Sequence, residues 1–164
     1  PGNVFAPVVT RDDRSVIVVK TDQTSAFAWM VPIEGGTPTQ ITDRVTQYPD
    51  VSPDGKFMAF FSADASNPPA IVVCELPGCK TLMRLPPTPT VTRLRWTPDG
   101  QGIAYHKDSN VWIQPLDGGP ARQLTHFTDG RTIPDFAWSR DGKRLAIARV
   151  SVANDIVLIK GLGK

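Results

Sequence analysis

The chain has 164 residues, of which 40% are hydrophobic and 21% are charged, and its formal net charge is +2. This composition is typical of a folded globular domain and excludes a disordered chain. The small net charge gives no reason to expect a nucleic-acid partner. No apolar stretch reaches the roughly 20 residues of a membrane span, so we expect no membrane insertion by this segment. The chain starts at Pro1 rather than Met, which favours a piece of a longer protein.

A four-residue motif recurs along the chain. It consists of a hydroxyl residue, any residue, Asp and usually Gly, at intervals of 42, 45 and 42 residues: Thr10–Asp13, Ser52–Gly55, Thr97–Gly100 and Ser139–Gly142. Asp hydrogen-bonds nearby backbone in tight turns, and Gly accepts the positive φ of a short hairpin. The motif therefore predicts a turn in each repeat, with structural rather than catalytic aspartates.

Short β-prone runs flank each motif. Residues one and three positions before it are mostly apolar, and this alternation predicts an inner strand. A second strand, a third strand and a closing strand follow in turn. In the first three repeats we expect these strands at 16–19, 27–31 and 39–42, at 57–61, 71–74 and 81–85, and at 103–105, 111–113 and 122–125. In the fourth repeat we expect the second and third strands at 145–148 and 156–159, and no closing strand is clear.

Four antiparallel strands in about 43 residues are typical of a propeller blade. The sequence therefore predicts an all-β protein, a β-propeller of about four blades at 1–43, 44–86, 87–126 and 127–164. A β-sandwich is a weaker alternative. Since the last repeat lacks a closing strand, either Val4-Phe5 supplies it or the blades belong to a larger propeller. Open blade edges would allow a homo-oligomer.

Candidate binding residues lie on the predicted inner strands and on the loops that lead into them. Propellers commonly bind ligands at the channel mouth, where inner strands converge. These residues are Arg44, Gln47, Tyr48, Asp50, Arg93, Arg95, Arg131 and Asp135. Their mixture of charge and one aromatic ring suits a polar peptide or protein segment. The alternative is that they solvate the rim or form ion pairs between blades.

Few other residues suggest chemistry. Cys74 and Cys79 flank a predicted hairpin turn, so they form either a disulfide, which would fit an oxidising compartment, or two separate thiols. His106 and His126 are isolated, and no nucleophile motif or metal-ligand spacing is present. We therefore expect a non-catalytic module without cofactor or metal. The alternatives are a propeller hydrolase or lyase that uses channel carboxylates, or an oligomerisation module.

Several of these segments resemble a known family. Residues 138–146, preceded by 118–125, resemble the TolB-type, WD-repeat-like propeller repeat, and residues 35–42 leading to 52–56 repeat this pattern. Residues 136–139 through 154–160 also resemble the C-terminal propellers of bacterial membrane-anchored serine/threonine kinases. The resemblance implies an extracytoplasmic, periplasmic sensor or interaction module. This chain carries no kinase motif.

Overall fold

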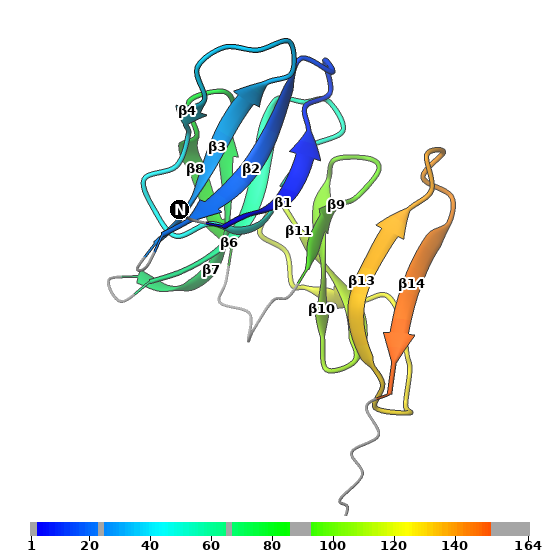
Figure 1. Cartoon of the computed structure of the whole chain (residues 1–164). Helices are drawn as coiled ribbons and strands as arrows, with labels where there is room; N and C mark the ends of the chain where they lie inside the picture. The colour runs from blue at the N-terminus through cyan, green and yellow to red at the C-terminus, as the bar shows by residue number, and fades with distance from the viewer. Residues whose placement is uncertain (1–2, 23–24, 65–66, 86–92, 152–164) are drawn as a thin grey trace, which may run out of the picture.

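The computed structural model describes residues 3–22, 25–64, 67–85 and 93–151, and every regular element in them is a β-strand. The strands form three four-stranded sheets and one two-stranded sheet, each an antiparallel meander in chain order. We call the sheets blades 1 to 4, and Figure 1 shows them side by side from β1–β4 to β13–β14. The predicted all-β propeller fold is confirmed. The strand expected at 156–159 lies outside the described residues.

The strands have the following bounds. Blade 1 contains β1 (Val4–Val9), β2 (Ser15–Thr21), β3 (Ala26–Pro32) and β4 (Thr39–Gln40); blade 2 contains β5 (Gln47–Val51), β6 (Phe57–Asp64), β7 (Asn67–Glu75) and β8 (Lys80–Leu85). Blade 3 contains β9 (Leu94–Trp96), β10 (Gly102–Lys107), β11 (Asn110–Pro115) and β12 (Arg122–Gln123); blade 4 contains β13 (Thr132–Trp138) and β14 (Leu145–Val150).

Each recurring motif forms the turn between the first and second strands of its blade. In blade 2, the hydroxyl of Ser52 donates to Asp54 Oδ1 at 2.6 Å and accepts from the N–H of Phe57 at 3.0 Å. Asp54 Oδ1 also accepts from the N–H of Lys56 at 3.1 Å. The same three bonds recur in the other blades, where the hydroxyls of Thr10, Thr97 and Ser139 bond to Asp12, Asp99 and Asp141. The four aspartates are therefore held in turns, as predicted.

The motif glycines have a second role at the blade junctions. A Cβ on Gly142 would lie 2.6 Å from Pro98 Cβ, and one on Gly55 would lie 3.0 Å from Arg11 Cβ. Pro98 and Arg11 occupy the second motif position of the preceding blade. Glycine at this position therefore allows a positive φ and leaves space for a side chain of the preceding blade.

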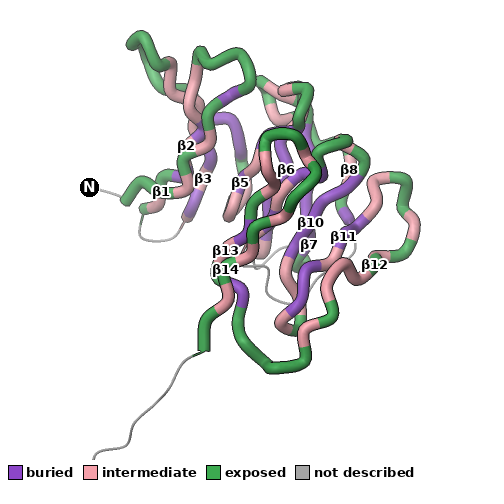
Figure 2. Tube along the Cα trace, turned by 90° about the vertical axis from the view of Figure 1, so that its right-hand side faces the viewer, coloured by how far each residue is buried: buried purple, intermediate pink, exposed green. Residues whose placement is uncertain are grey.

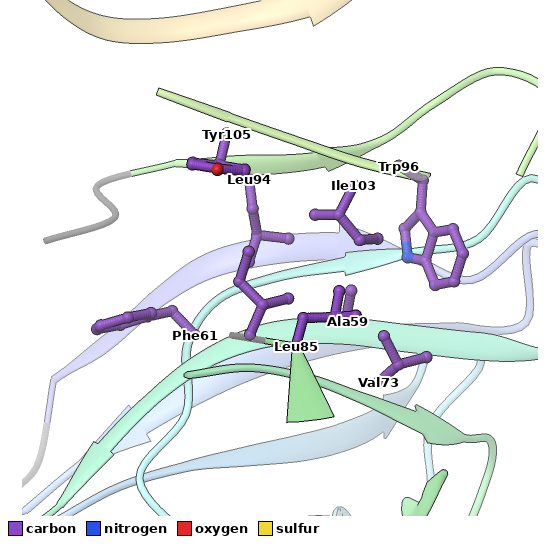
Figure 3. Close-up of a cluster of buried hydrophobic side chains, with 9 residues drawn as sticks. Ala59, Phe61, Val73, Leu85, Leu94, Trp96, Ile103 and Tyr105 are labelled. Carbon is purple, nitrogen blue, oxygen red and sulfur yellow. The ribbon is translucent and has the colours of Figure 1, made fainter. Parts of the chain in front are cut away.

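Apolar side chains from adjacent blades fill each junction. Between blades 2 and 3, Phe61 and Leu85 pack with Leu94, Trp96 and Tyr105, as Figure 3 shows. Trp138 packs in the same way between blades 3 and 4. Figure 2 shows that β6, β7 and β10 carry buried stretches, whereas β14 is intermediate or exposed throughout.

The first strand resolves one alternative left by the sequence. Val4 and Phe5 pair with Lys20 and Val19, so they belong to the inner strand of blade 1. The hypothesis that they complete the last blade is therefore wrong. They pair locally because the turn at Thr10 brings β1 directly back onto β2.

The hairpin between β7 and β8 carries the two cysteines. The structure joins Cys74 and Cys79 by a disulfide, with their Cα atoms 4.8 Å apart. Cys74 is fully buried in the junction between blades 1 and 2. Among the residues that the structure describes, none form a helix with the length and hydrophobicity of a membrane span.

Candidate functional site

The inner strands of all four blades converge on one hollow of about 400 Å³, here called the channel hollow. Its position follows from the repeat, because seven of the eight residues two and four positions before the motifs line it, and the eighth, Ala137, lines a neighbouring hollow. The residues of this kind are Ala6, Val8, Tyr48, Asp50, Arg93, Arg95 and Asp135, and Phe5, Pro7 and Pro49 complete the lining. Five of the eight predicted site residues therefore lie in one place.

A second hollow of about 420 Å³ lies against the motif turns and shares Asp50 and Arg95 with the first. It is lined by second-position motif residues, among them Arg11, Pro53 and Arg140. Asp50 and Arg95 therefore lie between the two hollows on the inner strands. The concave surface extends along these strands toward the turns.

Backbone bulges shape the inner strands where they line the channel hollow. The register of β1, β5 and β13 shifts just before the motif. Ala6 and Tyr48 occupy the same repeat position and have φ of 53° and 52°. A non-glycine residue in this region is uncommon and is maintained by its surroundings. Tyr48 lies within the register shift of β5 and lines the hollow together with Asp50, two residues further on.

An arginine pair and one carboxylate form the charged part of the channel hollow. Arg93 Nε lies 3.5 Å and Arg95 Nη2 lies 3.3 Å from the same oxygen, Asp135 Oδ1. The Arg93 guanidinium lies 5.2 Å from the centroid of the Tyr48 ring, within cation–π range. The side chains of Arg93, Arg95 and Asp135 are 36%, 28% and 51% exposed, so solvent and ligands can reach them.

Asp50 is the most buried carboxylate of the hollow. Its Oδ2 accepts from the backbone N–H of Trp96 at 2.8 Å, and its carbonyl accepts from Trp96 Nε1 at 3.1 Å. Burial raises the pKa of Asp50, and the Trp96 N–H and the charge of Arg95 oppose this rise. Asp50 therefore connects blades 2 and 3 while also lining the hollow.

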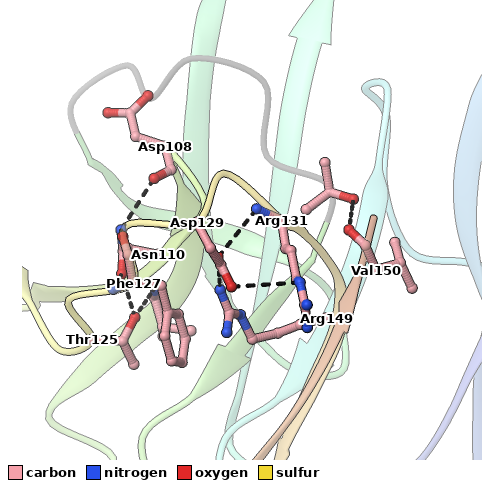
Figure 4. A network of polar contacts seen from close by, with 10 residues as sticks. Asp108, Asn110, Thr125, Phe127, Asp129, Arg131, Arg149 and Val150 are labelled. Atoms are coloured by element: carbon pink, nitrogen blue, oxygen red, sulfur yellow. Dashed lines mark hydrogen bonds and ion pairs between the residues drawn. The ribbon is translucent and has the colours of Figure 1, made fainter. Parts of the chain in front are cut away.

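The other three predicted residues lie elsewhere. Arg44 pairs with Asp43 at 3.0 Å in the loop before β5, and Gln47 starts β5 outside the hollow's lining. Arg131 pairs with Asp129 at 3.5 Å in the network of Figure 4, where Arg149 also bonds to Asp129. Arg44 and Arg131 belong to loops that lead into inner strands, and the sequence alone did not separate loop from channel.

The sequence analysis missed the apolar part of the lining. Phe5, Pro7, Val8 and Pro49 contribute it, three of them from blade 1. A signal was available, because Val8 occupies the repeat position of Asp50 and Arg95.

The described part of the chain contains no cluster of metal-ligating side chains and no histidine in the channel hollow. No group of three His, Cys, Asp or Glu side chains there could hold a metal ion. His106 lies on β10 and His126 in an exposed loop, and neither lines the channel hollow.

This architecture can be compared with those of known proteins. Residues 71–154 match the family model described as the dipeptidyl peptidase IV (DPP IV) N-terminal region. The chain belongs to this family. The matched segment starts on β7 and runs through blades 3 and 4, so the DPP IV N-terminal model covers the arginine pair and Asp135.

The similarity to solved structures covers nearly the whole length of this member of the DPP IV N-terminal family. TolB from Acinetobacter baumannii is 23% identical with a TM-score of 0.77, over 93% of this chain and 39% of that one. A putative TolB from Agrobacterium tumefaciens is 17% identical with a TM-score of 0.65, over 85% and 62%. The β-propeller domain of the Trilobed protease from Pyrococcus furiosus is 14% identical with a TM-score of 0.61, over 89% and 48%.

These likenesses establish a TolB-like β-propeller fold. The chain spans about two-fifths of the Acinetobacter TolB and less than two-thirds of the Agrobacterium protein. No curated protein sequence matches the chain.

Proposed function

We propose that this chain is a non-catalytic propeller module that binds a polar peptide or protein segment in the channel hollow. One observation carries the proposal: Arg93 and Arg95 flank a single carboxylate, Asp135, inside a concave site built by the inner strands. Concave sites with apolar walls and a few convergent polar groups are the usual form of binding sites.

The charge of this cluster indicates the chemistry of the ligand. Arg93 and Arg95 share the Asp135 carboxylate, whereas the second carboxylate of the hollow, Asp50, is more buried and accepts the backbone N–H of Trp96. Guanidinium groups present a planar set of donors that matches a carboxylate. Phe5, Pro7 and Pro49 offer apolar surface beside them. These features favour a peptide segment that places an Asp, a Glu or a C-terminal carboxylate against the arginines.

We further propose that the module is the sensory or scaffolding part of a larger bacterial signalling protein, in an extracytoplasmic compartment. The disulfide between Cys74 and Cys79 supports an oxidising compartment. The similarity to bacterial TolB structures and the resemblance to kinase-linked propellers support this context. The net charge of +2 argues against a nucleic-acid partner.

Titration calorimetry with a hexaglutamate peptide tests the binding proposal, with hexaserine as the neutral control peptide. We expect wild-type protein to bind hexaglutamate, and the Arg93→Gln/Arg95→Gln variant to bind it at least tenfold more weakly. Arg44→Gln/Arg131→Gln removes the same two charges outside the hollow and should leave binding unchanged. Equal affinity in all three proteins, or no heat in any of them, would contradict the proposal.

A second candidate function is a hydrolase or lyase that uses the channel carboxylates. Burial raises the pKa of Asp50, and Asp50 shares the hollow with Asp135. Perturbed carboxylates in a cleft are candidates for acid–base roles. Hydrolysis or elimination of a peptide or uronide substrate that disappears in Asp50→Asn would favour this candidate over the binding module.

A further inference from the structure

Equivalent inner-strand residues bond differently at two neighbouring blade junctions. Between blades 2 and 3, Asp50 Oδ2 accepts the backbone N–H of Trp96 at 2.8 Å, and the Asp50 carbonyl accepts Trp96 Nε1 at 3.1 Å. Between blades 3 and 4, Arg95 occupies the repeat position of Asp50, and Trp138 occupies that of Trp96. A cation therefore stands at the second junction where the first junction has a carboxylate. Both junctions lie between blades that the structure describes.

The backbone N–H of Trp138 points away from its own sheet partner, β14. The next residue, Ser139, donates its N–H to the carbonyl of Arg144 at the turn between β13 and β14. Because the N–H groups of consecutive strand residues point to opposite sides, the N–H of Trp138 points out of the β13–β14 pair. The N–H of Trp96 has the same direction in blade 3, and it meets the Asp50 carboxylate there. Trp138 therefore directs a donor to the side on which the equivalent donor of blade 3 binds a carboxylate.

The indole of Trp138 shows the same difference from Trp96. Its Nε1 is buried and has no hydrogen-bond partner among the described residues, whereas Trp96 Nε1 donates to the Asp50 carbonyl. Most buried N–H groups in proteins are hydrogen-bonded, and an unpaired one costs free energy. The junction between blades 3 and 4 is therefore less completely bonded than the preceding one, and a bound acceptor would stabilise it.

The second hollow, of about 420 Å³ and here called the junction hollow, lies against this pair of residues. Arg95 and Trp138 both line it, and Arg11 and Arg140 contribute two further guanidinium groups. Asp50 is the one carboxylate in this lining, and it is already bonded to the N–H of Trp96. Three cations against one carboxylate make the junction hollow favourable for an anionic group.

Arg95 retains donors for such a group. Its Nη1 donates to the carbonyl of Leu94 at 3.0 Å and its Nη2 donates to Asp135 at 3.3 Å, which uses two of the five N–H donors of a guanidinium. Its side chain is 28% exposed. Arg95 also lines both hollows, so a ligand that follows the inner strands contacts it from either one.

We propose that a carboxylate of the bound peptide segment occupies the junction hollow, where it accepts the backbone N–H of Trp138 and pairs with Arg95. It takes the role at this junction that the Asp50 carboxylate has at the preceding one. Hydrogen bonds from a backbone N–H to a carboxylate are stronger than those to a neutral acceptor. This subsite rests on the proposed function, because the same segment places a second acidic group against Arg93 in the channel hollow. The ligand is therefore a segment with two acidic groups, one for each hollow.

The backbone amide resonance of Trp138 during titration with hexaglutamate tests this subsite. We expect its proton to move downfield, because hydrogen bonding to a carboxylate deshields an amide proton, while the Trp96 amide stays in place because it already bonds to Asp50. Arg44→Gln removes a charge outside both hollows and should show the same response. Shifts at Tyr48 and Asp135 with Trp138 unchanged would overturn the subsite and leave the proposed function standing. Shifts at none of these residues would overturn both.

A pair of substitutions tests the same geometry without a ligand. Arg95→Asp places a carboxylate at the repeat position of Asp50, and Arg95→Ala removes the same guanidinium without supplying an acceptor. In peptide-free protein we expect the Trp138 amide proton to move downfield in Arg95→Asp and to keep its wild-type position in Arg95→Ala. An unchanged Trp96 amide in both variants shows that the preceding junction is intact. The same Trp138 shift in both variants would overturn the proposal, because the N–H would then not meet an acceptor at this position.

Discussion

Asp50 and Trp96 connect two blades through both backbone and side chain. The carboxylate of Asp50 accepts the backbone N–H of Trp96, and its carbonyl accepts the indole N–H of the same residue. At the junction between blades 3 and 4, Arg95 occupies the repeat position of Asp50, and the indole Nε1 of Trp138 is buried without a hydrogen-bond partner. The residue two positions before the motif therefore determines which hydrogen bonds join a blade to the next one.

We predict that Asp50→Ala destabilises the protein by about 1–3 kcal/mol, because it leaves the Trp96 N–H without its acceptor. Asp50→Asn keeps an oxygen acceptor and should cost less than about 1 kcal/mol. Urea unfolding of the three proteins measures the difference. Equal losses in both variants would mean that the charge, rather than the hydrogen bond, holds the junction.

The raised pKa of Asp50 adds a pH dependence with a definite sign. The folded state holds this proton to a higher pH than the unfolded state, so Asp50's contribution to stability falls as pH rises from the ordinary aspartate value through the raised one. Asp50→Asn removes this term. The difference in unfolding free energy between wild type and Asp50→Asn should therefore shift in favour of the Asn variant as pH rises.

The four turn aspartates have the opposite pH dependence. Hydrogen bonds from the motif hydroxyls lower the pKa of Asp12, Asp54, Asp99 and Asp141. Each contribution is complete above the ordinary aspartate pKa of about 3.9 and is lost as pH falls below it. We predict that the urea midpoint drops steeply between about pH 4 and pH 2.

Ser52→Ala isolates one of these turns. Without the hydroxyl, Asp54 loses the main cause of its lowered pKa and Phe57 loses an acceptor, so stability should fall by about 1–2 kcal/mol with a shallower acid transition. Ser62→Ala is the matched control, because the Ser62 hydroxyl is buried without a hydrogen-bond partner. An unchanged acid transition in Ser52→Ala would refute the role of the hydroxyl.

Gly142→Ala should be among the costlier glycine substitutions. It combines a φ of 69° with a Cβ only 2.6 Å from Pro98 Cβ, and we expect a loss of about 2–4 kcal/mol. Gly118→Ala has the same conformational strain at φ 85° but open space around the new Cβ, and should cost about 1 kcal/mol. Thermal unfolding of both variants gives the difference, and similar losses would show that neighbouring blades do not pack against this turn.

The disulfide should contribute about 2 kcal/mol, because it closes a short loop in the unfolded chain. Reducing agent should therefore lower the urea midpoint of wild-type protein and leave that of Cys79→Ser unchanged. Thiol titration of the native, oxidised protein checks the premise, and two reactive thiols would contradict it.

The repeat made the blades and turns predictable, because Asp and Gly at fixed spacing have a local conformational cause. It also located the channel, since Tyr48, Asp50, Arg93, Arg95 and Asp135 occupy equivalent positions before each motif. The register shift of β5 between Gln47 and Asp50 was not predictable, because it depends on the pairing between β5 and β6.

The contact between Pro98 and Gly142 could not be anticipated either, because it joins residues of different blades. Local sequence explains a positive φ at such a glycine but does not show which neighbour packs on it. Arg44 and Arg131 were grouped with the channel because their loops precede inner strands, whereas in the structure they pair with Asp43 and Asp129 and do not line the hollow.

The central claim is that the inner-strand hollow is the binding surface of this module. Backbone amide chemical shifts recorded during titration with hexaglutamate test it most directly. We predict saturable shifts centred on Tyr48, Arg95 and Asp135, with blade 2's outer strand β8 unaffected. Shifts confined to β8 or to the outer loops, or no shifts at saturating peptide, would contradict the claim.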